Sequence, residues 1–165
     1  MYQRASYTLL VSLLRHRPPA RAIVMGSEAY PGIRGEVLFY ETRYGVFVIA
    51  DMSGLPENSG QCADGILGFH IHGGERCSGD IDTPFSAAGE HYNPGNCPHP
   101  YHAGDLPPLF AAGGRAFSAF LTNRFSVDEI IGKTVIVHGS ADDFTTQPGG
   151  NAGQRIACGV IRGNL

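Results

Sequence analysis

The chain has 165 residues, of which 42% are hydrophobic and 16% charged, and its formal net charge is −3. This length suffices for one domain with its own core. The lack of a long basic run argues against a nucleic-acid partner, and no stretch is apolar enough to cross a membrane. The 23 glycines and 11 prolines are spread along the chain, which indicates short strands joined by turns.

Residues 1–19 are predicted to form a short N-terminal extension. An apolar run from Tyr7 to Leu14 is followed by basic residues and by Pro18 and Pro19. A secretory signal would need a longer apolar region and a small-residue cleavage site, whereas prolines end helices. We therefore expect a short helix here. Without a convincing signal we also expect a cytoplasmic location, with secretion or the periplasm as the alternative.

The rest of the chain, residues 20–165, is predicted to be one all-β domain. Alternating β-branched and aromatic residues predict strands at 20–26, in a hairpin over 33–56, and at 66–72, 113–122, 133–139 and 155–161. A turn or short helix is expected at 125–132, with Ser126 as N-cap and Glu129 three residues later. Seven or eight short strands indicate a Greek-key β-sandwich or flattened barrel.

Two long loops, 73–109 and 141–153, interrupt this pattern, and long loops in compact domains are usually functional. The segment 68–105 holds five of the seven histidines. In the strand before the first loop, Phe69 and Ile71 share one face, so His70 and His72 should lie side by side on the outer face.

Imidazoles and a carboxylate at such short spacings predict metal binding. His70 and His72, joined by His138 from another strand, form an all-nitrogen set that suits copper. His99, His102 and Asp105 form a compact set that suits tetrahedral zinc. His91 could complete either group, and an imidazolate that bridges two metals would use both of its nitrogens.

The four cysteines, Cys62, Cys77, Cys97 and Cys158, permit two disulfides in three connectivities. No two of these cysteines have the CxxC spacing, which makes a zinc-finger arrangement a weak alternative.

Six segments carry a resemblance to a known family. In chain order GFHIH, GEHYNP, HAGDLP, GKTVIVH, ADD and GNAGQRIACGVI resemble copper/zinc superoxide dismutases, over residues 20–162. The resemblance implies an eight-stranded Greek-key β-sandwich and an enzyme that disproportionates superoxide to oxygen and hydrogen peroxide, with copper and zinc as cofactors. The alternative is a non-catalytic copper- and zinc-binding or metal-buffering domain of the same fold.

By the same resemblance, each site residue has an expected role. The copper ligands would be His70, His72, His91 and His138, and the zinc ligands His91, His99, His102 and Asp105. His91 would bridge the two metals and act as a catalytic proton carrier. Asp142 would orient one histidine of each metal, Arg155 would attract and orient superoxide, and Cys77 would be disulfide-bonded to Cys158.

The sequence departs from the family pattern at three places. Glu90 stands where a small residue is usual, the gap between His99 and His102 is short, and the loop after Asp143 is short and uncharged. Cys62 and Cys97 have no counterpart, so a second disulfide between them and two free thiols both stay open. The oligomeric state is open as well, with a homodimer as one arrangement.

Overall fold

The computed structural model describes residues 15–56 and 65–164, and the strands within these ranges are short. They are β1 (Ala20–Gly26), β2 (Arg34–Thr42), β3 (Gly45–Ser53), β4 (Ile66–Leu67), β5 (Phe69–His72), β6 (Leu109–Phe110), β7 (Arg115–Thr122), β8 (Thr134–His138) and β9 (Arg155–Gly163). The described helices are the single turn η1 (Ser86–Ala88) and α2 (Val127–Ile130). The helix expected in the N-terminal extension falls mainly on residues 1–14, outside the described residues.

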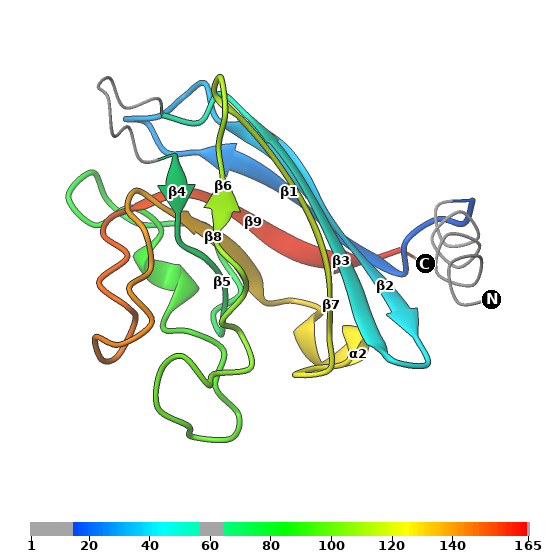
Figure 1. Cartoon of the computed structure of the whole chain (residues 1–165). Helices are drawn as coiled ribbons and strands as arrows, with labels where there is room; N and C mark the ends of the chain where they lie inside the picture. The colour runs from blue at the N-terminus through cyan, green and yellow to red at the C-terminus, as the bar shows by residue number, and fades with distance from the viewer. Residues whose placement is uncertain (1–14, 57–64, 165) are drawn as a thin grey trace.

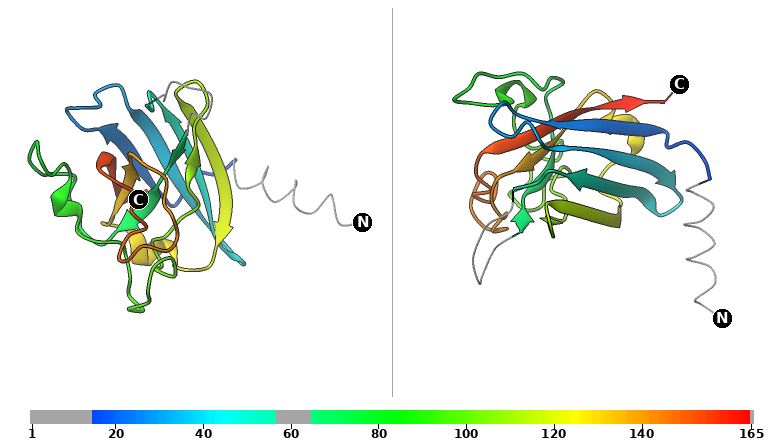
Figure 2. Two further views of the ribbon diagram at one scale, coloured as in Figure 1. Left: turned by 60° about the vertical axis from the view of Figure 1, so that its left-hand side comes forward. Right: turned by 90° about the horizontal axis from the view of Figure 1, so that it is seen from above.

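Seven strands form one antiparallel sheet in the order β5-β8-β9-β1-β2-β3-β7, and β4 pairs with β6 in a separate two-stranded ladder. The large sheet curls into a half-barrel, which Figures 1 and 2 show from three sides. Only Gly68 separates β4 from β5, so residues 66–72 are one extended run that changes partner from β6 to β8. Counted in this way the fold has eight strands among the described residues, which confirms the predicted all-β Greek-key fold.

Sequence alternation accounts for most of these elements. In β1 every second residue is buried, and the hairpin of β2 and β3 turns where expected, with Thr42 opposite Gly45. The capping box of α2 is also present, because the backbone N–H of Ser126 donates to Glu129 Oε2 at 2.6 Å. Strand β6 was not predicted, since two residues at the end of a loop are too short to show a period.

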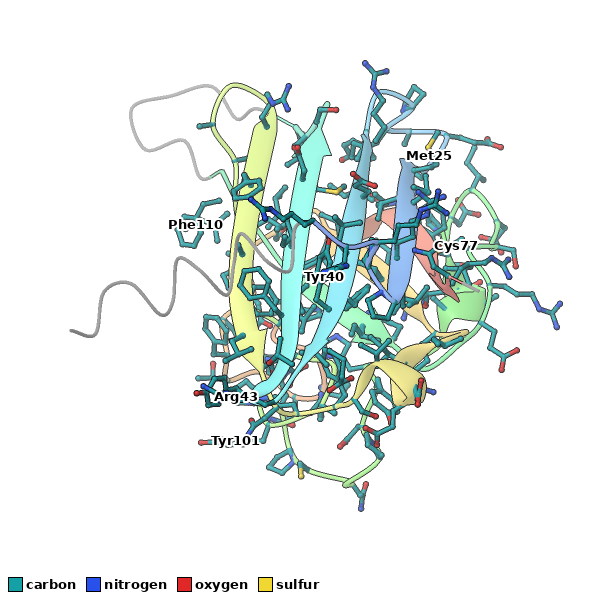
Figure 3. The ribbon with its side chains drawn as sticks, turned by 90° about the vertical axis from the view of Figure 1, so that its right-hand side faces the viewer. Met25, Tyr40, Arg43, Cys77, Tyr101 and Phe110 are labelled. Carbon is teal, nitrogen blue, oxygen red and sulfur yellow. A yellow bond between two sulfur atoms is a disulfide. The ribbon has the colours of Figure 1, made fainter. Side chains whose placement is uncertain are left out.

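The concave side of the sheet holds the core. Apolar side chains from all of the longer strands meet there, including Val24, Val37, Phe39, Met52, Phe69, Ile71, Leu109 and Ile156. The convex side carries scattered exposed apolar residues, among them Met25 on β1 (Figure 3) and Phe117 on β7. No helix of the described residues is long and apolar enough to span a membrane.

A second, smaller apolar cluster lies outside the main core. Ala88, Ile136 and Cys158 are buried together, and Cys77 and Phe85 pack against them. The disulfide between Cys77 and Cys158 ties this part of the first loop to β9, as the resemblance implied. The first loop, green in Figure 1, and the second loop, orange, therefore lie together over the end of the sheet formed by β5, β8 and β9.

Candidate metal centre

The two histidines of β5 do not face solvent. Phe69 and Ile71 point into the core, and His70 and His72 lie on the opposite face, as alternation requires. The relative exposures of His70 and His72 are 0% and 1%, so the expectation of exposed imidazoles was wrong. Single-strand periodicity gave the correct face, but it could not show that the two long loops cover that face.

The free edge of β5 anchors the first loop. The backbone N–H of Ile71 donates to Gly104 O, and the N–H of Tyr92 donates to Ile71 O, both at 2.8 Å. These bonds set His91 opposite His72 and Asp105 opposite His70. At Gly104 a side chain would start 2.2 Å from Ile71 O, so only glycine permits this close approach.

A β-bulge sets the end of β8. Val137 pairs with Ala157 but His138 pairs with Arg155, so Ile156 is the extra residue of the bulged strand. Bulges re-aim side chains and are common next to functional sites. Here the bulge brings Arg155 opposite His138 at the edge of the histidine cluster.

The first cluster consists of His70, His72, His91 and His138, each with one ring nitrogen within 4.8 Å of the others. Three of the rings are oriented by a hydrogen bond from their other nitrogen. His72 Nδ1–H donates to Gly89 O at 2.8 Å, and His138 Nδ1–H donates to Gly153 O at 3.1 Å. Their Nε2 atoms then face each other at 3.4 Å. His70 Nε2–H donates to Asp142 at 2.7 Å, which leaves its buried Nδ1 without a hydrogen-bond partner.

The second cluster consists of His91, His99, His102 and Asp105, again with ligand atoms within 4.8 Å of one another. Asp105 Oδ1 lies 2.7 Å from His91 Nδ1 and 3.2 Å from His102 Nδ1. Asp105 Oδ2 lies 3.1 Å from His99 Nδ1, but the angles do not make a hydrogen bond, and this nitrogen is buried without one. Three imidazole nitrogens therefore converge on one carboxylate.

Asp142 connects the two clusters. Its Oδ2 accepts from His70 Nε2–H at 2.7 Å and its Oδ1 from His99 Nε2–H at 2.9 Å. Gly150, with φ of +67°, lies directly behind it, since a side chain there would start 2.0 Å from Asp142 Oδ1. One carboxylate thus fixes which nitrogen a histidine of each cluster turns toward the centre.

Burial keeps the three histidines of the first cluster that lie on strands neutral. Desolvation lowers the pKa of His70, lowers that of His72 well below its ordinary value, and lowers the pKa of His138 to about 3. Burial alone would raise the pKa of Asp142, but the hydrogen bonds from His70, the N–H of Phe144 and His99 outweigh it and hold that pKa well below its usual range. At neutral pH His70, His72 and His138 are therefore uncharged imidazoles backed by the ionised carboxylate of Asp142, which is the form that binds metal ions.

The donor sets fit two different metals. Four imidazole nitrogens suit copper, and three imidazoles with one carboxylate suit tetrahedral zinc. The two buried ring nitrogens without partners, on His70 and His99, belong one to each set. Buried polar atoms are rarely left unpaired, so a metal ligand at each position accounts for both.

Arg155 lies at the edge of the first cluster with its side chain about one-fifth exposed, at 21%. Its Nη1 donates to Phe85 O at 2.9 Å and its Nη2 to Gly89 O at 2.7 Å. Gly89 O also accepts from His72, so one carbonyl orients both side chains. The exposed carboxylate of Glu90 stands 4.0 Å from Arg155 Nη2.

Two residues outside the predicted set also hold the site. Gln147 makes two hydrogen bonds with the backbone of His99, at 2.9 and 2.8 Å, and Arg124 donates to the backbone carbonyls of His102 and Asp105. Neither belongs to a recognisable motif, so only the position of the loops could identify them. Cys97 is exposed and has no disulfide within the described part of the chain, and Cys62 lies outside the described residues.

Comparison with known proteins gives a consistent result. The family model described as copper/zinc superoxide dismutase matches residues 33–161. A superoxide dismutase (Cu-Zn) of Legionella pneumophila is 32% identical over 163 residues, 94% of each chain. One of Deinococcus radiodurans is 32% identical over 148 residues, 79% of this chain and 78% of that protein. The superoxide dismutase-like protein YojM of Bacillus subtilis is 33% identical over 113 residues, 59% of this chain and 56% of that protein.

Proposed function

Because this chain belongs to the copper/zinc superoxide dismutase family, a family of oxidoreductases, we propose that it disproportionates superoxide to oxygen and hydrogen peroxide. The observation that carries the proposal is a single histidine shared by two clusters of different donor type. We assign His70, His72, His91 and His138 to copper, and His91, His99, His102 and Asp105 to zinc. Copper supplies one-electron redox chemistry when bound, by which one superoxide is oxidised and a second reduced.

His91 is the bridging and proton-carrying residue in this proposal. Its Nδ1 faces Asp105 and His102, at 2.7 and 3.4 Å, and its Nε2 is then left for the first cluster. A side chain at Gly149 would start 3.3 Å from that Nε2, so glycine keeps this side of the ring open. Held from the zinc side, His91 can carry a proton on Nε2 and deliver it to the reduced substrate.

Arg155 is the residue that we propose attracts the superoxide anion. The carbonyls of Phe85 and Gly89 hold its guanidinium in one orientation, and an arginine remains charged at every physiological pH. A fixed cation beside the copper ligands attracts superoxide although the whole chain carries a net charge of −3. Asp142 acts differently, since it touches His70 and His99 and keeps both rings turned toward their metals.

The disulfide indicates the cellular compartment in which the protein works. A bond between Cys77 and Cys158 is typical of an oxidising compartment, and bacterial relatives match most of the chain. We therefore favour the periplasm or secretion over the cytoplasmic location expected from the sequence.

We further propose that the enzyme domain spans residues 20–165. The partners expected from the sequence were superoxide, a homodimer as one arrangement, and neither nucleic acid nor membrane, and of these we propose only superoxide.

A ligand substitution tests the function. His70→Ala should reduce dismutation to the background of the metal-free protein, because it removes one of the proposed copper ligands. His16→Ala, at an exposed position far along the chain from both clusters, is the control and should keep full activity. Copper bound by the wild type without any dismutation would support the non-catalytic metal-binding alternative.

A further inference from the structure

Arg124 lies outside both clusters, in the connection between β7 and α2, yet it contacts the loop that carries the second cluster. Its Nη1 donates to Pro100 O at 3.0 Å, to His102 O at 3.2 Å and to Asp105 O at 3.1 Å. Two of these three carbonyls belong to assigned zinc ligands. The guanidinium touches neither the imidazole of His102 nor the carboxylate of Asp105, so any effect on metal binding is indirect.

The segment from Pro98 to Asp105 is a tight turn whose backbone bond to the sheet is made at Gly104. Within it, the N–H of Tyr101 donates to Pro98 O at 2.8 Å, and the N–H of His102 donates to Asp105 Oδ2 at 2.9 Å. These bonds orient the Asp105 carboxylate relative to His102 but do not fix the turn to the barrel. Three carbonyls of the turn, those of Pro100, His102 and Asp105, accept hydrogen bonds from Arg124.

Other hydrogen bonds hold this loop at residues other than His102 and Asp105. The backbone bonds to Ile71 hold Tyr92 and Gly104, and Gln147 holds His99. Among the described residues, the side chain that hydrogen-bonds the backbone carbonyls of both His102 and Asp105 is that of Arg124. Hydrogen bonds from a charged donor are stronger than neutral ones, and the cation also offsets the partial negative charge of the three carbonyl oxygens.

We propose that Arg124 is a positioning residue of the zinc site, which holds His102 and Asp105 at the spacing that retains zinc. This inference rests on the proposed assignment of the second cluster to zinc. It predicts that loss of Arg124 speeds zinc release and distorts the ligand geometry, while the strand-borne histidines of the first cluster are unaffected.

The test uses the full chain with its disulfide intact, loaded with Zn²⁺ alone. Zinc release to a chromogenic chelator is measured for the wild type, Arg124→Ala and Arg124→Lys. Residues behind metal ligands typically contribute about 10- to 100-fold to affinity, so Arg124→Ala should release zinc at least about tenfold faster. Arg124→Lys keeps a cation with three donors on one nitrogen and should recover much of the wild-type rate.

Arg115→Ala is the matched control. Arg115 also lies at an end of β7 and pairs at 3.4 Å with Asp51, both largely exposed, so its loss should leave zinc release unchanged. The visible absorption of Co²⁺ in the same site reports ligand geometry and should change in Arg124→Ala only. A purely structural role would instead lower the melting temperature of the metal-free protein with no change in the cobalt spectrum.

The two proposals fail in different ways. Zinc released at the same rate by the wild type and Arg124→Ala would overturn the positioning role alone. A wild-type protein that retains no zinc would overturn the assignment of the second cluster, and the positioning role with it. If Arg124→Ala does not fold, Arg124→Lys and Arg124→Gln give the comparison, and faster zinc release by the glutamine variant than by the lysine variant is the expected result.

Discussion

The two histidine clusters share one residue but are built in different ways. The first takes His70, His72 and His138 from paired strands, where β5 and β8 are in register. In the second, all four residues come from the loop stretch 91–105. Strand register fixes the first cluster through the sheet and its core, whereas the second depends on a few side-chain and backbone anchors.

This difference predicts which site needs its metal to become ordered. The three strand-borne histidines of the first cluster are in place whether or not copper is bound, and their neutral imidazoles are ready to coordinate. A cluster held by a loop gains order when zinc joins its ligands, because metal binding and folding are coupled. Three variants test this difference and a fourth tests the charge beside the first cluster, from the largest expected effect to the smallest.

Asp105→Ala should have the largest effect, because it removes one of the four proposed zinc ligands and the carboxylate on which three histidines converge. Structural zinc contributes about 10 to 16 kcal/mol, so an even share for one of four ligands is roughly 2.5 to 4 kcal/mol, on the order of 100- to 1000-fold in affinity. A competition titration measures the loss of zinc affinity, and amide hydrogen exchange measures the loss of order in the loop. Exchange should rise in residues 91–105 and stay unchanged in β8, and zinc content equal to wild type would contradict the assignment.

Removing the disulfide should have the next largest effect, because it frees the first loop from β9. The double change of Cys77→Ser and Cys158→Ser opens a link between residues 81 positions apart, which typically costs about 2 to 5 kcal/mol of stability. Denaturant unfolding of the metal-free protein measures it. The loss should include the small cluster at Ile136 and Phe85, and unfolding at the wild-type denaturant concentration would show that the loop is held without the bond.

Asp142→Asn should weaken both clusters to a smaller extent. The amide offers one acceptor in place of two, so either His70 or His99 faces an N–H group and loses its orientation. A change of this kind behind the ligands costs about 10- to 100-fold in metal affinity. Copper and zinc titrations on the same sample give both values, and a loss confined to one metal would show that Asp142 does not connect the two sites.

Glu90→Gln should have the smallest effect and should increase the rate. The Glu90 carboxylate, 4.0 Å from Arg155 Nη2, partly cancels the charge that we propose attracts superoxide. Because Glu90 is exposed, its removal should speed dismutation only about two- to threefold at low ionic strength, and the gain should disappear as salt is added. Glu36→Gln, which removes the same charge from the outer face of β2, is the control, and an equal gain there would point to net charge alone.

The sequence predicts the strand-based parts of this molecule better than the loop-based parts. Alternation gave β1, the hairpin of β2 and β3, and the face on which His70 and His72 lie, because each depends on neighbours in sequence. It could not give their burial, which depends on two loops folding over that face. Ordered motifs indicated the candidate ligands, and the structure groups them into the two expected clusters.

The supporting residues could not be predicted in the same way. Arg124 and Gln147 act through hydrogen bonds to backbone carbonyls and amides far along the chain. Such contacts leave no pattern in residue type or spacing. The bulge that sets Arg155 opposite His138 is likewise a property of strand pairing, which a single strand does not reveal.

The most direct test of the enzyme assignment is the rate of superoxide decay by pulse radiolysis, on protein reconstituted with equimolar copper and zinc. A fast second-order reaction that requires copper and is lost in His70→Ala is the predicted result. A rate no higher than the background, with copper shown to be bound, would contradict superoxide dismutation and leave a metal-binding domain of the same fold.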